Sequence, residues 1–344
     1  MVPVRRAKTL WQLRRQKDDE ATRVRRFRRR RYPGSRTRLY EIHLPPSYTG
    51  KTALPLVMVL HGCRQSQEDI RQISTFDAIA DRERFIVVYP YVTAYVDFRI
   101  RNCWGWWRES EIRPGAGEVE DLWQIVEEVK AEFNVDPRRI HATGLSSGGS
   151  MAVAAMVAHA SKLASGAVVA GVPYAETSRA VATGPGANPV FRPIEEVASA
   201  MDAVMGDEKR AVPVFIVHSH DDPVVDIQCA RNIRDSLARC FEIDTSRRIS
   251  ARAGNTRGTA WVHKKYRGGG RRTAIETLFL EGAGHGWYGG KPGEFSYPDA
   301  PNVAERIWEF LKRHPLEQSA YRKQLQSNEL RPVVLLPEAV AVGA

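Results

Sequence analysis

Hydrophobic residues along the chain form short runs that alternate with longer amphipathic stretches. The runs at 54–60, 85–89, 164–170 and 212–219 are almost wholly apolar, which is typical of strands buried on both faces of a parallel sheet. Residues 38–44 alternate like a half-buried strand, and 139–144 and 274–280 complete the predicted strands. Helical spacing of apolar residues predicts helices over residues 66–84, 118–133, 149–159, 194–205, 227–241 and 301–313.

Strands that alternate with helices in this way predict an α/β fold with a mostly parallel central sheet and helices on both faces. In such sheets, binding and catalytic residues gather at the carboxyl ends of the strands. Polar residues that directly follow a predicted strand are therefore the first candidates for chemistry.

The positive charge of the chain is concentrated at its N-terminus. The formal net charge is +11, yet residues 1–40 hold 15 Lys and Arg against three acidic residues, and the remainder holds 36 against 37. We therefore expect a basic arm over residues 1–35, a folded domain over 36–314 and a tail over 315–344 with an apolar patch at 333–336. The composition of the arm favours a solvated, partly disordered extension, and docking on an anionic surface is the alternative.

Targeting and redox signals are sparse. The chain has no run of 18 apolar residues, so we expect no transmembrane segment, and the basic arm lacks the apolar stretch of a signal peptide, which predicts a cytoplasmic location. Four cysteines are too few for a disulfide scaffold and show no zinc-binding spacing. Cys229 and Cys240 lie about three turns apart on one predicted helix, which identifies them as free thiols.

A GxSxG pentapeptide occupies residues 144–148, between a predicted strand and a predicted helix. Glycines at both ends allow the sharp turn that lifts the central Ser146 hydroxyl out of the sheet, as in a nucleophile elbow. A serine hydroxyl is a poor nucleophile at neutral pH and needs a base, an acid that orients the base, and donors for an oxyanion.

The acid and the base are expected further along the chain, in the order serine, acid, histidine. Asp222 follows the strand at 212–219 and is the preferred acid, with Asp221 and then Asp226 as alternatives. The competing interpretation is that the pair Asp221 and Asp222 caps the helix that begins near residue 227.

The preferred general base is His285, because it stands between two glycines after the strand at 274–280, in a loop from which its ring can reach a serine. His218 and His220 precede the acid in the chain and are therefore less suitable. The turn at His61-Gly62-Cys63 follows the strand at 54–60. The backbone amides of Cys63 and Ser147 are the expected oxyanion donors.

Five segments together carry a family resemblance: residues 60–63, 103–107, 144–149, 222–225 and 284–287. In this order they resemble the esterase family of polyhydroxybutyrate (PHB) depolymerases, which is similar to feruloyl and acetylxylan esterases. The resemblance implies an α/β-hydrolase fold and ester hydrolysis through an acyl-enzyme, without a metal or other cofactor. It also implies a disulfide between Cys63 and Cys103. Many relatives are secreted, so an extracellular location is the alternative.

Several tryptophans lie close to these motifs. Trp287 and one of Trp106 and Trp107 are expected to form an apolar wall for an acyl or polymer chain, with Trp104 in the core. The sequence therefore predicts a serine esterase for hydroxyalkanoate or small acyl esters. A feruloyl or acetylxylan esterase is the alternative, and a nucleic-acid or anionic-surface binding protein that uses the basic arm is the alternative from another class.

Overall fold

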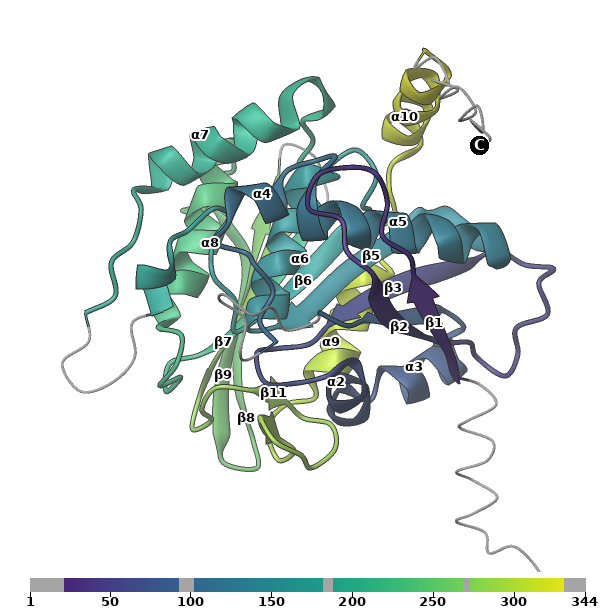
Figure 1. The fold of residues 1–344 in the computed structure, drawn as a ribbon. Helices are drawn as coiled ribbons and strands as arrows, with labels where there is room; N and C mark the ends of the chain where they lie inside the picture. Colours follow the sequence, from purple (N-terminus) through teal and green to yellow (C-terminus); the bar gives the residue numbers. More distant parts are fainter. Residues whose placement is uncertain (1–21, 93–101, 182–187, 269–272, 331–344) are drawn as a thin grey trace, which may run out of the picture.

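The computed structural model describes residues 22–92, 102–181, 188–268 and 273–330. Its centre is a ten-stranded sheet in the order β1-β2-β4-β3-β5-β6-β7-β10-β9-β8 (Figure 1). The strands are β1 (Thr22–Phe27), β2 (Arg38–His43), β3 (Leu54–Leu60), β4 (Ile86–Pro90), β5 (Val135–Leu145), β6 (Ser165–Val169), β7 (Val214–Ser219), β8 (Arg248–Thr256), β9 (Thr259–Arg267) and β10 (Thr273–Glu281). The strands from β4 to β10 in this order are parallel, and antiparallel strands flank them on both sides.

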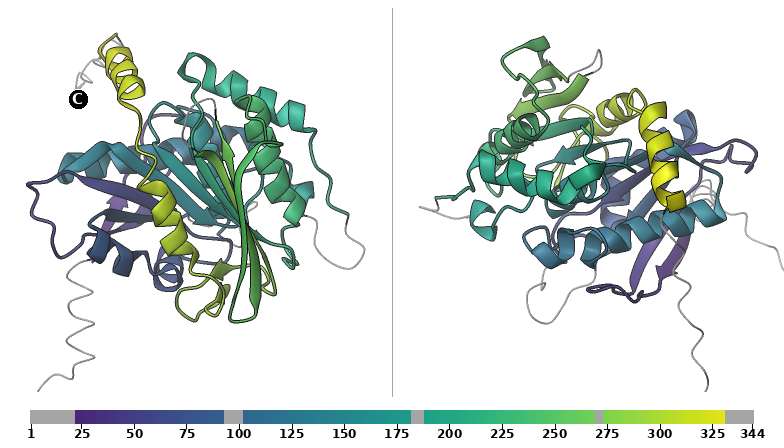
Figure 2. Two further views of the ribbon diagram at one scale, coloured as in Figure 1. Left: turned by 180° about the vertical axis from the view of Figure 1, so that it is seen from behind. Right: turned by 90° about the horizontal axis from the view of Figure 1, so that it is seen from above.

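Helices cover both faces of the sheet, as the alternating pattern predicts. One core packs α5 (Gly117–Glu132), α6 (Ser147–Ala158), α7 (Ile194–Met205) and α8 (Ile227–Cys240) on one face. The other packs α2 (Gln67–Ser74), α3 (Phe76–Glu83) and α9 (Val303–Leu311), with α9 running across the near face of the sheet when seen from behind (Figure 2). Leu56, Met58 and Leu60 of β3 belong to the first core, and Val57 and Val59 belong to the second. Burial on both faces explains the apolar run at 54–60.

Shorter elements complete the structure. They are α4 (Glu109–Ile112), the 3-10 helices η1 (Ser178–Val181) and η2 (Gly206–Glu208), the strand pair β11 (Trp287–Tyr288) and β12 (Ser296–Tyr297), and α10 (Gln318–Leu330). None of the helices in the part of the chain described by the structure combines the length and apolar character needed to cross a bilayer.

The helix predicted over residues 66–84 is two helices. Ser66 begins α2 with a capping box, and Thr75, which ends α2 and precedes α3, has a left-handed backbone with φ 63°. The Ile73 carbonyl accepts a hydrogen bond from the Lys291 amide at 3.2 Å instead of extending the helix. A contact with a segment more than two hundred residues away thus interrupts a periodic pattern.

The hairpin of β8 and β9 has no counterpart among the predicted elements. The two strands pair from Arg248↔Tyr266 to Thr256↔Thr259, and Arg257 and Gly258 form the turn with φ of 46° and 93°. Positive φ at both turn residues is typical of a tight type I′ hairpin. The sequence of this hairpin shows no clear alternation of apolar and polar residues, because Lys and Arg occupy positions on both of its faces.

The basic arm is folded from Thr22 onward, which corrects the boundary predicted at residue 36. Strand β1 pairs antiparallel with β2, and Phe27 is fully buried. Arg25 donates two hydrogen bonds to Glu132 at 2.7 and 3.3 Å, and Arg30 donates one to Glu128 at 2.7 Å. Part of the positive charge assigned to an anionic partner is thus paired within the chain. Residues 1–21 and the apolar patch at 333–336 lie outside the described residues.

Candidate active site

Ser146 lies at the sharp turn between β5 and α6. Its backbone has φ 56° and ψ −120°, a conformation that non-glycine residues seldom adopt, and its amide donates to the Val169 carbonyl at 2.8 Å. A Cβ on Gly144 would lie 2.5 Å from the backbone of Gly148, and one on Gly148 would lie 2.4 Å from the carbonyl oxygens of Leu60 and His61. Both flanking glycines are therefore required by close backbone contacts at this turn.

His285 and Asp222 are joined by a hydrogen bond of 2.7 Å between Nδ1 of the histidine and Oδ2 of the carboxylate. The other carboxylate oxygen, Oδ1, accepts the amides of Val224 and Val225, both at 2.8 Å. Burial alone would raise the pKa of Asp222, but the hydrogen bond and charge of His285, together with the Val225 amide, lower it below its ordinary value. Asp222 is thus an ionised carboxylate that fixes the orientation of the imidazole.

The alternative acids have other partners. Asp221 accepts the Gly282 amide at 2.6 Å, which holds the loop that carries His285 without touching the ring. Asp226 caps α8 by accepting the Gln228 amide at 2.7 Å. The residue that caps this helix is therefore Asp226, and not the pair Asp221 and Asp222.

The two alternative histidines, His218 and His220, also have other partners. His218 is fully buried, and its Nε2 bonds the Val225 carbonyl at 2.7 Å and lies 3.5 Å from Asp222. Burial lowers the pKa of His218, so this ring is neutral and supports the turn that holds Asp222. His220 packs edge-on against Phe279.

Ser146 and His285 line the same cavity, which has a volume of about 420 Å³. Among the described residues no hydrogen bond joins the Ser146 hydroxyl to the His285 ring. Hydrogen bonds between a nucleophile and its base are often long in unliganded enzymes and tighten when substrate binds. The structure therefore brings histidine and acid into contact and places the serine beside them on one cavity.

The turn at residues 61–63 borders this cavity and is held from several sides. His61 Nδ1 donates to the Gly62 carbonyl at 2.8 Å and its Nε2 accepts the Val92 amide at 3.1 Å, so the ring is neutral. Burial lowers the pKa of His61 to about 4, which agrees with this tautomer. Gln65 accepts the Gly62 amide at 2.9 Å. Cys63 and Ser147 both line the cavity.

The remaining cavity wall is mostly apolar. Trp106 and Trp107 both line it, with their rings edge to face at a centroid distance of 5.3 Å. The other lining residues include Val172, Ser178, Val181, Val224, Val225 and Phe295. No catalytic motif in the sequence points to these residues, and only Val224 and Val225 carry a local signal, since they belong to the same turn as Asp222.

Trp287 does not line the cavity, which corrects its predicted contact with substrate. It is fully buried in the core under α2 and α3, where it packs against Phe76 at a centroid distance of 5.9 Å. Trp287 lies only two residues after His285, but its ring belongs to this core and not to the cavity that His285 lines. Trp104 lies in the core, as expected, and donates from Nε1 to the His61 carbonyl at 3.0 Å.

A disulfide joins Cys63 to Cys103, so the turn at residues 61–63 is covalently tied to the segment that carries the tryptophans. Cys229 and Cys240 are unbonded and buried. Burial raises the pKa of both thiols, to about 11 for Cys240, so neither is a ready nucleophile.

The sheet order, the elbow and the cavity at the strand ends define this protein as an α/β hydrolase. The fold resembles an acetyl xylan esterase from Aspergillus awamori with a TM-score of 0.66 at 17% identity, covering 84% of this chain and 99% of that one. The profile described as Esterase PHB depolymerase matches residues 38–260. The chain belongs to this PHB depolymerase family of esterases.

The names of individual relatives give different substrates. Poly(3-hydroxyalkanoate) depolymerase C from Paucimonas lemoignei is 26% identical over 236 residues, which cover 67% of this chain and 55% of the relative. Feruloyl esterase B from Thermothelomyces thermophilus is 23% identical over 244 residues, which cover 67% and 78% of the two chains. The chain thus spans only about half the length of the depolymerase.

Proposed function

We propose that this protein is a serine esterase that hydrolyses carboxylic esters through an acyl-enzyme. The observation that carries the proposal is the 2.7 Å hydrogen bond between His285 and Asp222 at the edge of a cavity that Ser146 also lines. Family membership and the strained backbone of Ser146 support the same reaction.

In the first half of the reaction, His285 Nε2 accepts the proton of Ser146 as the serine oxygen attacks the ester carbonyl. Asp222 stabilises the imidazolium that forms. The amides of Cys63 and Ser147 donate to the oxyanion, and among the described residues neither amide has another hydrogen-bond partner. The tetrahedral intermediate expels the alcohol, which takes the proton from His285 and leaves Ser146 acylated.

In the second half, His285 removes a proton from water, and the resulting hydroxide attacks the acyl-enzyme. Collapse of the second tetrahedral intermediate releases the carboxylic acid and returns the proton to Ser146. Donors in the oxyanion site typically contribute factors of about 100 to 1000 in turnover. The firm support of Gly62 by His61 and Gln65 provides the preorganisation that such a contribution requires.

The substrate class proposed is hydroxyalkanoate oligomers or polymer, together with small acyl esters. Membership of the PHB depolymerase family and the mostly apolar cavity support it. A feruloyl or acetylxylan ester is a second candidate, because Trp106, Trp107 and Phe295 offer aromatic faces to an aromatic acyl group.

The test of the reaction is hydrolysis of p-nitrophenyl butyrate by the parent protein and by Ser146→Ala. Loss of nearly all turnover in the variant is expected, and turnover near the parental level would refute the role of Ser146. The two substrate classes are separated by comparing hydroxybutyrate trimer with methyl ferulate. We expect the higher kcat/KM for the trimer, and the reverse ranking would favour the second candidate.

A further inference from the structure

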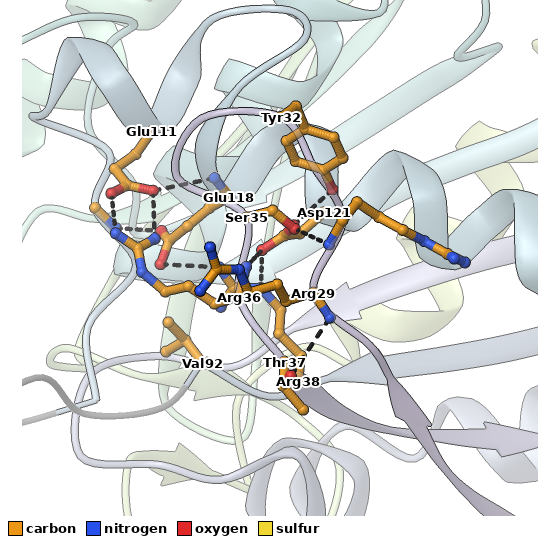
Figure 3. A network of polar contacts seen from close by, with 12 residues as sticks. Arg29, Tyr32, Ser35, Arg36, Thr37, Arg38, Val92, Glu111, Glu118 and Asp121 are labelled. Atoms are coloured by element: carbon orange, nitrogen blue, oxygen red, sulfur yellow. Dashed lines mark hydrogen bonds and ion pairs between the residues drawn. The ribbon is translucent and has the colours of Figure 1, made fainter. Parts of the chain in front are cut away.

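A buried network of charged residues connects the N-terminal segment to α4 and α5, on the side of the cavity where the tryptophans lie. Figure 3 shows its members, with Arg36 and Arg38 facing Glu111, Glu118 and Asp121. Arg38, Glu118 and Asp121 are completely buried. Burying charged groups is costly unless they are paired, so a network of this size calls for an explanation beyond stability.

Arg38 is the centre of the network. Its Nε donates to Asp121 at 2.7 Å and its Nη2 lies 3.7 Å from Glu118 Oε1. Asp121 also accepts the hydroxyls of Tyr32 at 2.6 Å and Ser35 at 2.7 Å. The turn before β2 and the N-terminal half of α5 are therefore fixed to each other around this guanidinium.

Two contacts lead from this centre to the cavity. Glu118 Oε2 accepts the Gly105 amide at 2.6 Å, and Gly105 directly precedes the wall residues Trp106 and Trp107. The Arg38 guanidinium lies 5.7 Å from the centre of the Trp104 ring, within the range of a cation–π contact. Trp104 in turn donates to the His61 carbonyl at 3.0 Å, at the start of the oxyanion turn.

We propose that Arg38 and Glu118 are positioning residues for the esterase reaction, because together they hold the tryptophan wall through Gly105 and the oxyanion turn through Trp104. This inference rests on the proposed function. Arginine suits this place because its planar guanidinium faces two carboxylates and a ring at once, whereas a lysine is a single point charge.

Glu118→Gln is the most informative change because it keeps the size of the side chain. If the glutamine oxygen accepts the Gly105 amide, its NH₂ group faces Arg38, so a donor meets a donor and an attractive contact becomes repulsive. The tryptophan segment then shifts relative to Ser146. A displacement near 1 Å is enough to lower turnover by about 100-fold, so we expect a loss of about tenfold or more.

The experiment measures kcat per active site on p-nitrophenyl acetate and p-nitrophenyl hexanoate, with active sites counted by fluorophosphonate titration. Glu128→Gln is the matched control, because it lies on the same helix and pairs with Arg30 of the same N-terminal segment. Glu118→Gln should lose about tenfold or more on both esters, and Glu128→Gln should stay within about twofold. A purely structural role would lower the melting temperature and the number of titrated sites, but not kcat per site.

Glu118→Gln with kcat per site within about twofold of the parent would overturn the inference while leaving the esterase proposal intact. If Glu118→Gln does not fold, Arg38→Lys decides, because it retains the cation. We then expect a partial loss of kcat per site, and an unchanged value would overturn the inference. A parent protein that hydrolyses neither ester would overturn both the inference and the proposed function.

Discussion

Replacing Asp222 by asparagine is expected to abolish most turnover because of two fixed hydrogen bonds. Asp222 Oδ1 accepts two amides at 2.8 Å, so the single oxygen of an asparagine is needed on that side. Its NH₂ group then faces His285 Nδ1, where Oδ2 now accepts at 2.7 Å. The imidazole must present a lone pair at Nδ1 and carry its proton on Nε2. In that tautomer the ring cannot accept the proton of Ser146.

The wrong tautomer typically costs a serine hydrolase a factor of about 10⁴ in kcat, which corresponds to about 5 kcal/mol of transition-state stabilisation. The assay is steady-state hydrolysis of p-nitrophenyl butyrate at pH 7.5, with the fold checked by the melting temperature. Asp221→Asn is the control, because its oxygen still accepts the Gly282 amide, and we expect a loss below about tenfold. An Asp222→Asn enzyme within about tenfold of the parent, or a larger loss in Asp221→Asn, would refute the assignment.

Three further predictions concern stability and acyl specificity. Reduction of the Cys63–Cys103 bond opens a loop of 40 residues and should lower the free energy of unfolding by about 3–4 kcal/mol in urea titrations; no shift with dithiothreitol would contradict this. Trp107→Ala should raise KM for p-nitrophenyl hexanoate more than for the acetate, and equal changes would remove it from the acyl wall. Burial opposes ionisation of Glu276, but its hydrogen bond to His263 and nearby cations lower its pKa to about 2. The lowered pKa of Glu276 therefore adds about 3 kcal/mol to the free energy of unfolding above pH 4.5, and this stabilisation is lost as the pH falls towards 2. In urea unfolding, Glu276→Gln should show a free energy of unfolding that depends less on pH over this range.

The central sheet is predictable from the sequence because strands buried on both faces leave continuous apolar runs. The run at 54–60 and strand β3 coincide residue for residue. Interruption of the helix at Thr75 is not predictable in this way, since its cause is a contact with Lys291. Strand β1 is not predictable for a different reason. Its arginines favour a solvated arm as long as their partners on α5 are unknown.

In the candidate site, too, some residues can be predicted from the sequence and others depend on contacts between distant segments. Chain order and strand ends select Ser146, Asp222 and His285 from local sequence alone. Proximity in sequence misplaces Trp287, because its ring packs into the core against Phe76, a residue more than two hundred positions away that no local pattern identifies. The contact between Arg38 and Glu118 joins residues that are eighty positions apart, and no local pattern announces it.

Covalent labelling tests directly whether Ser146 is the nucleophile. The parent protein is treated with a fluorophosphonate, digested, and mapped by peptide mass spectrometry, with Ser146→Ala and Asp222→Asn alongside. We predict one adduct, on Ser146, absent from Ser146→Ala and formed much more slowly in Asp222→Asn. An adduct on another residue, or an active esterase that takes no label at Ser146, would show that Ser146 is not the nucleophile.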